Sequence, residues 1–201
     1  MGQERMPEGL EAEALKENIL GLGAKAAAVI PVDSISFDRA FRDMCASNAC
    51  GNYGKSYMCP PDVGEIDDLI RQVKSYSHAV VYQTIGLLED SYDFEGMMET
   101  GQFHNALAQN VRELFEKSFG KKALHLGAGG CRLCPVCGKK TGEPCRFPDK
   151  AMSSLEAYGV NVSKLAAQCG MRYNNGKNTV TYFGAVFFNF KDTEKEERPK
   201  R

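Results

Sequence analysis

The 201-residue sequence lacks tryptophan, an excess of either charge, and any apolar run long enough to cross a membrane. A spanning helix needs about 20 apolar residues, so no membrane contact is expected. The formal net charge is −1, which argues against an extended basic face for nucleic acid. Residues 1–10 are polar and acidic and contain no apolar signal-peptide segment. We therefore expect a cytoplasmic protein with neither a membrane nor a nucleic-acid partner.

Signatures of common enzyme classes are also missing. We recognise no Ser-His-Asp arrangement, no dinucleotide-binding fingerprint and no obvious carboxylate pair. The glycine-rich stretch at residues 127–130 leads into cysteines and not into a helix N-terminus, so we reject a phosphate-binding loop there. The three histidines, His78, His104 and His125, are expected to be structural. A redox enzyme with an open iron site remains as one alternative.

Helical and strand patterns alternate along the chain, which is typical of an α/β domain. About four strands are expected, near residues 26–37, 78–88, 122–127 and 179–190. Helices are expected near residues 12–22, 66–73 and 100–119, and Ser153 with Glu156 resembles a capping box for a shorter helix. The last strand is apolar on nearly both faces, which favours the middle of a sheet.

One domain of this size can bury a core without help from disulfides or metals. We assign residues 1–190 to a single α/β metal-binding domain. Residues 191–201 are almost all charged, which is typical of a disordered tail. The sequence predicts no oligomeric state.

Eight cysteines are the most unusual feature of the composition. Cysteines in a reducing cytoplasm seldom form disulfides and are more often metal ligands. Two short windows contain seven of them: Cys45, Cys50 and Cys59 in the first, and Cys131, Cys134, Cys137 and Cys145 in the second. Cys169 stands alone near the end of a predicted helix, where a small buried side chain is expected, with a remote fourth ligand for the first window as the alternative.

The second window has the spacing of an iron–sulfur loop. Its first three cysteines are separated by two residues each, and Cys145 follows Cys137 after seven more. Bacterial ferredoxins use such closely spaced thiolates with a more distant fourth to hold a [4Fe–4S] cluster. Zinc stays as the alternative, although two paired Cys-x-x-Cys units would suit a tetrahedral zinc site better.

Basic residues surround this window: Arg132, Lys139, Lys140, Arg146 and Lys150. Singly, each is an ordinary solvated loop charge. As a set they would lower the electrostatic cost of an anionic thiolate cluster. They would also suit an acidic redox partner protein.

The first window, Cys45-x4-Cys50-x8-Cys59-Pro60-Pro61, matches no zinc or ferredoxin spacing. Three thiolates in a loop rich in glycine and asparagine still predict a metal site, with the fourth position open. The Cys59-Pro60 pair resembles the Cys-Pro that ends a ferredoxin run, whose cysteine ligates the other cluster. We expect the three sulfurs to converge and the two windows to lie on one side of the sheet, holding one or two clusters.

Together the two windows resemble the domain of unknown function 2284 family of predicted metal-binding proteins. The similarity rests on the Cys50–Pro61 loop, the second cysteine window, residues 151–160 and the last strand. It covers roughly residues 15–190 and implies metal binding in a family that is frequent in anaerobes. This chain has Ala49 and Gly51 where prolines flank the second cysteine of the family.

The pattern as a whole predicts an iron–sulfur protein that acts in electron transfer or supports a partner enzyme. In such proteins the cluster supplies the chemistry, and the fold sets its potential and access. A zinc-stabilised interaction module is the main alternative, because a structural zinc ion also contributes directly to folding.

Overall fold

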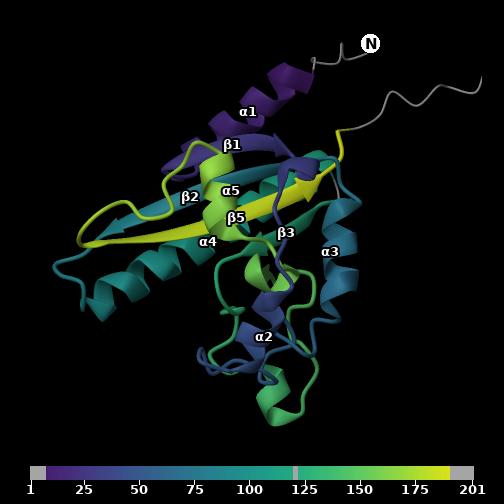
Figure 1. Ribbon diagram of the computed structural model, residues 1–201, viewed down its shortest axis with the longest axis vertical. Helices are drawn as coiled ribbons and strands as arrows, with labels where there is room; N and C mark the ends of the chain where they lie inside the picture. The colour runs from purple at the N-terminus through teal and green to yellow at the C-terminus, as the bar shows by residue number, and fades with distance from the viewer. Residues whose placement is uncertain (1–7, 120–121, 191–201) are drawn as a thin grey trace, which may run out of the picture.

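The computed structural model describes residues 8–119 and 122–190 (Figure 1), so the predicted tail at 191–201 lies outside the described residues. The helices are α1 (Glu8–Gly21), α2 (Ala40–Ala46), α3 (Ile66–Lys74), α4 (Phe94–Phe119) and α5 (Val162–Gln168). The strands are β1 (Ala26–Pro31), β2 (His78–Leu87), β3 (Leu124–Gly127), β4 (Ser153–Ser154) and β5 (Thr179–Phe188). Short 3-10 helices are η1 (Val32–Ser34), η3 (Gly138–Thr141) and η4 (Glu156–Tyr158).

The five strands form one mixed sheet in the order β1-β2-β5-β3-β4. All neighbours are antiparallel except β3 and β4, which are parallel. The predicted α/β architecture is therefore confirmed, and β5 lies in the middle of the sheet as expected. β2 and β5 have nearly continuous runs of buried residues, which explains this placement, because successive side chains enter opposite cores.

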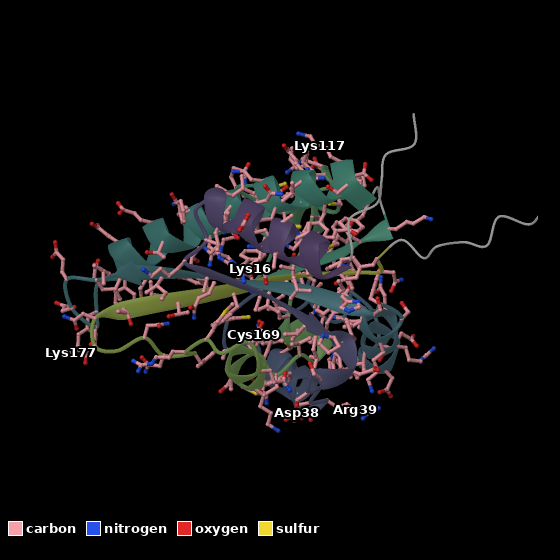
Figure 2. All side chains as sticks on the ribbon, turned by 90° about the horizontal axis from the view of Figure 1, so that it is seen from above. Lys16, Asp38, Arg39, Lys117, Cys169 and Lys177 are labelled. Atoms are coloured by element: carbon pink, nitrogen blue, oxygen red, sulfur yellow. The ribbon has the colours of Figure 1, made fainter. Side chains whose placement is uncertain are left out.

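Helices cover both faces of the sheet (Figures 1 and 2). Val80 of β2 and Phe188 of β5 pack with α1 and α4 on one face. Val81 of β2 and Phe187 of β5 pack with α3 and α5 on the other. β2 and β5 therefore contribute to both cores. Each Å² of apolar surface that they remove from water stabilises the fold by roughly 25 cal/mol.

The expected count of about four strands was one too low. Ser153 and Ser154 form β4, which pairs with Leu126 and Gly127 of β3. A two-residue strand is too short to show the alternation of apolar and polar residues that identifies a strand. Its serines were therefore interpreted as part of a helix cap. The predicted capping box at Ser153 is absent: the N-cap of η4 is Leu155, which has no capping side chain. The Ser154 hydroxyl, one residue before it, accepts a hydrogen bond from the Ala157 N–H at 3.1 Å.

Two element boundaries also differ from the sequence prediction. The first strand ends at Pro31, and η1 follows it where an extended segment to residue 37 was expected. Helix α4 begins at Phe94 and not near residue 100, and the Asp93 carboxylate accepts the Gly96 N–H at 2.8 Å. Phe94 and Met98 are exposed, so this first part of α4 lacks the core-facing stripe on which the prediction relied.

Among the described residues, we find no helix that combines the length and the apolarity needed to cross a membrane.

The sheet carries the two cysteine windows toward one end of the molecule. The first window connects α2 to α3, and the second connects β3 to β4. Both loops lie below the sheet in Figure 1, around α2. The two windows, about 70 residues apart in the sequence, therefore lie side by side.

Candidate metal centre

The first window folds back on itself through local hydrogen bonds. Cys45 lies in the last turn of α2, not in the loop where it was expected. After it, Asn48 takes a left-handed conformation (φ 55°), and its side-chain oxygen accepts the Tyr53 N–H at 3.0 Å. The Gly54 N–H then donates to the Pro60 carbonyl at 2.9 Å. These bonds close the loop that carries Cys50 and Cys59 back beside α2.

The second window starts where β3 ends. Residues 128–130 lead from β3 into the Cys131 loop, and η3 turns the chain between Cys137 and Cys145. The Glu143 N–H donates to the Gly138 carbonyl at 2.9 Å, which closes this turn. The chain then returns to the sheet as β4, so both ends of the window are fixed by strands.

At least four contacts hold the windows against each other. The Ser153 hydroxyl donates to the Met58 carbonyl at 2.7 Å, and the Tyr57 hydroxyl donates to the Glu143 carbonyl at 2.8 Å. Lys139 of the second window pairs with Asp62, just beyond the first. The fourth contact is a close packing at Gly130.

Gly130 packs directly on the first window. A Cβ at this position would lie 3.2 Å from Nδ2 of Asn52 and 3.6 Å from Sγ of Cys59. Glycine therefore lets the backbone before Cys131 approach the sulfur of Cys59 closely. The expected proximity of the two windows is present in the structure.

The thiols of the first window affect one another electrostatically. Burial raises the pKa of Cys59, and the nearby thiols of Cys50, Cys45 and Cys131 raise it further. Burial likewise raises the pKa of Cys45, with Cys50 adding to the effect. Thiolates this close repel one another, and a bound cation would relieve that repulsion.

Cys131 lies close to sulfurs of both windows. Burial raises the pKa of its thiol, the backbone N–H groups of Leu133 and Met152 oppose the rise, and Cys145 and Cys134 add to it. Cys131 therefore has thiol neighbours in both windows: Cys59 in the first, and Cys134 and Cys145 in the second.

Cys137 has different surroundings. Burial raises the pKa of its thiol, but hydrogen bonds from the backbone N–H groups of Lys139 and Tyr57 and from the Ser56 hydroxyl outweigh it. The charge of Lys140 acts in the same direction, and the net shift of the pKa is downward. N–H and O–H donors of this kind are typical of protein groups that stabilise and tune a metal-bound sulfur.

Two of the five basic residues around the second window, Lys139 and Arg146, form ion pairs within the protein. Arg146 pairs with Glu143, donates to the Val136 carbonyl at 2.9 Å, and also interacts with the Cys134 sulfur. Lys139 forms an ion pair with Asp62. Arg132 makes no ion pair or hydrogen bond with the described residues. The basic set therefore divides into two residues that brace the loop and three, Arg132, Lys140 and Lys150, that form no ion pair with the described residues.

The donor set fits a thiophilic metal. All eight cysteines are free thiols, and seven of them belong to the two adjoining windows. In the described part of the chain, however, no three His, Cys, Asp or Glu side chains are arranged to hold one ion. The convergence of the sulfurs on a metal therefore stays a prediction.

Cys169 lies apart from both windows. It ends α5 and packs half-buried against the core on the α3 and α5 face (Figure 2). Burial alone raises the pKa of its thiol to about 11. A protonated, core-packed thiol agrees with the structural role predicted for it.

Sequence reasoning missed the residues that join the two windows. Ser56 donates to the Cys137 sulfur, and Ser153 holds the carbonyl next to Cys59. Ser56 precedes Cys59 by three residues, so the sequence weakly indicated that it lies near the cysteines. Ser153 contacts a residue 95 positions away, and no sequence pattern indicates such a contact.

The family model described as "Predicted metal-binding protein (DUF2284)" matches residues 28–188 of the chain. The matched segment contains both cysteine windows and every strand from the middle of β1 to the end of β5. No curated protein and no solved structure matches the chain.

Proposed function

This chain belongs to the DUF2284 family of predicted metal-binding proteins, and on that premise we propose that it holds an iron–sulfur centre that serves electron transfer. Cys131, Cys134, Cys137 and Cys145 would hold a [4Fe–4S] cluster, whose chemistry when bound is the gain and loss of one electron. Cys45, Cys50 and Cys59 form the adjoining wall, either as ligands of the same centre or of a second one.

The contact between the windows supports this proposal most directly. Cys59 and Cys131 come from loops about 70 residues apart, yet the Cys131 thiol lies close enough to raise the pKa of Cys59. Hydrogen bonds from Ser153 and Tyr57 fix the two loops in this arrangement. A protein that needed only a stable core would not have to gather seven thiols at one end of its sheet.

The surrounding residues suit a redox role. Donors to the Cys137 sulfur favour its thiolate form, and the same kind of bond tunes cluster potential. Arg132 and Lys140 are exposed cations beside the cysteines, which would favour docking of an acidic redox protein. The proposal places the protein in a reducing compartment such as the cytoplasm, where free thiols persist.

Anaerobic purification followed by analysis of iron, acid-labile sulfide and zinc tests the proposal. We expect brown protein with iron and sulfide in near-equal amounts. Stoichiometric zinc without sulfide under these conditions would instead support a zinc-stabilised interaction module. Anaerobic handling is essential, because exposed clusters decay in air and zinc then occupies the vacated thiolates.

A matched pair of variants tests whether the first window takes part. Cys59→Ala removes the thiol beside Gly130, whereas Ser47→Ala removes only an exposed hydroxyl that bonds locally to the Met44 carbonyl. If the windows share ligands, Cys59→Ala lowers the iron content and Ser47→Ala does not. Full iron content in both variants would restrict the centre to the second window.

A further inference from the structure

A cavity of about 370 Å³ opens beside the second window, at the point where β3 ends. β3 pairs with residues Ala185–Phe187 of β5, so the preceding residues of β5 have no strand on that side. The cavity lies along this edge, between Thr181–Phe183, the first half of α4 and residues 128–132. Its volume falls within the range of small-molecule sites, roughly 300–1,000 Å³.

The walls of the cavity are aromatic and sulfur-containing. Tyr173 and Phe183 stack with their ring planes 10° apart and their centroids 6.1 Å apart. Met97 and Met98 of α4 also line the cavity. Flat rings and flexible thioethers together suit a planar aromatic ligand, because thioethers contact ring edges favourably.

The rim of the cavity exposes large apolar side chains to solvent. Phe94 is 69% exposed, Met98 58% and Tyr173 54%, and all three border the same cavity. The floor, by contrast, is buried, with His104 1% exposed and Phe183 3%. An apolar rim around a buried floor is typical of a ligand-binding groove.

Polar groups mark two sides of the cavity. Arg132 lies at the side of the second window and has no partner among the described residues. Nδ1 of His104 shares a hydrogen bond with the Thr84 hydroxyl at 2.8 Å. The buried Nε2 of His104 has no hydrogen-bond partner in the described structure. Glu156 lines the inner wall and acts on Cys45 of the first window. One free guanidinium at the rim favours a single carboxylate, which arginine binds through two hydrogen bonds.

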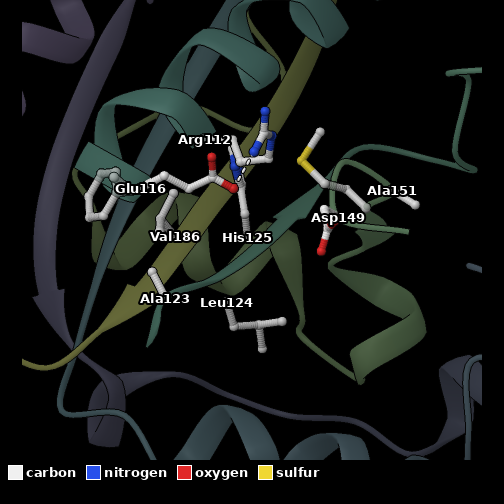
Figure 3. A pocket seen from close by; sticks show the side chains of 10 residues that line it. Arg112, Glu116, Ala123, Leu124, His125, Asp149, Ala151 and Val186 are labelled. Carbon is white, nitrogen blue, oxygen red and sulfur yellow. Dashed lines mark hydrogen bonds and ion pairs between the residues drawn. The ribbon is translucent and has the colours of Figure 1, made fainter. Parts of the chain in front are cut away.

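A second cavity makes a useful contrast. It has a volume of about 260 Å³ and is lined by Arg112, Glu116 and His125 (Figure 3). Arg112 is already engaged by Glu113 and Glu116, so its charge is compensated within the protein. The larger cavity is therefore the better candidate for an anionic ligand.

We propose that the larger cavity binds a small planar aromatic carboxylate, with the carboxylate on Arg132 and the ring against Tyr173 and Phe183. Arg132 directly follows Cys131, and a smaller adjoining cavity that shares Arg132 and Gly129 is lined by Cys131 itself. The bound molecule thus lies next to the candidate centre. Its role as a redox substrate rests on the proposed function, whereas its binding depends only on the cavity.

Calorimetry with three probes of similar length tests the proposal on anaerobically purified protein. Cinnamate is planar and anionic, cinnamylamine is planar and cationic, and 3-cyclohexylpropanoate is anionic without a flat ring. We expect cinnamate to bind most tightly. Tighter binding of cinnamylamine, equal binding of the saturated acid, or no binding of cinnamate would each overturn the proposal.

Three variants connect the binding to the cavity. Arg132→Gln should weaken cinnamate binding roughly tenfold, the usual effect of losing a charge-assisted hydrogen bond. Tyr173→Ala, at an exposed position far in sequence from the cysteines of both windows, should weaken it by about fivefold. Lys140→Gln removes one charge from the same window but does not line the cavity, so it should bind like wild type. Equal affinity of wild type and Arg132→Gln contradicts the assignment.

Iron and sulfide are measured on every sample to separate the two proposals. Cinnamate binding by protein that holds no iron would support the cavity and contradict the iron–sulfur centre. Iron-loaded protein that fails to bind cinnamate would contradict the cavity alone.

Discussion

Ser153→Ala should weaken the junction between the two cysteine windows. The Ser153 side chain is 4% exposed and its hydroxyl donates to the Met58 carbonyl at 2.7 Å, next to Cys59. Alanine leaves this carbonyl without its donor, at a cost of about 1–3 kcal/mol. For a chain of this size the loss corresponds to a fall of roughly 2–12 °C in the unfolding midpoint, since each kcal/mol shifts it by about 2–4 °C.

Ser75→Ala is the matched control for this experiment. The Ser75 hydroxyl donates to the Gln72 carbonyl at the same distance of 2.7 Å, but the bond is local and exposed. Its loss should change stability by less than about 0.5 kcal/mol. Thermal unfolding followed by circular dichroism measures both variants, and transfer of metal to a chelator shows whether the centre loosens. Equal midpoints and equal transfer rates for the two variants would refute the role assigned to Ser153.

The remaining predictions concern the ligands, the sheet and pH. Cys134→Ala should abolish most metal binding while Cys169→Ala keeps it, as measured by metal per protein; equal loss would make Cys169 a ligand. Gly184→Ala would place a Cβ 2.2 Å from the Tyr82 ring, so we expect a cost of roughly 1–3 kcal/mol in urea unfolding, and an unchanged midpoint would contradict this close packing. Burial lowers the pKa of His104 from 6.5 to about 4, so the unfolded chain takes up a proton first as pH falls. Stability should therefore decline between about pH 6.5 and pH 4, and His104→Gln should show a shallower decline in urea midpoints; identical slopes would rule out His104 as the cause.

The central part of the sheet could be predicted because its signal is local and strong. Residues 179–190 are apolar on both faces, and only a strand covered on both sides satisfies such a pattern. The N-cap of α5 is an equally local feature, since the Asn161 side chain accepts the Lys164 N–H at 3.1 Å within one turn.

The parts that were missed depend on distant partners. β4 is a strand only because Leu126 and Gly127 of β3 lie beside it. The start of α4 carries exposed apolar residues such as Phe94 and Met98, so it has no apolar stripe facing the core. The cysteine spacing identified the candidate ligands but not their grouping, because the approach of Cys59 to Gly130 follows from the fold.

The position of β5 at the C-terminal end of the described chain has a consequence for biosynthesis. β3 reaches the rest of the sheet only through β5, which lies between it and β2. Every window cysteine is therefore translated before the strand that brings the two loops together. At roughly 5–20 residues per second, the 43 residues from Cys145 to Phe188 take about 2–9 s to synthesise. During that interval seven thiols emerge without their final neighbours, so any metal held by both windows must be inserted after β5 has been synthesised.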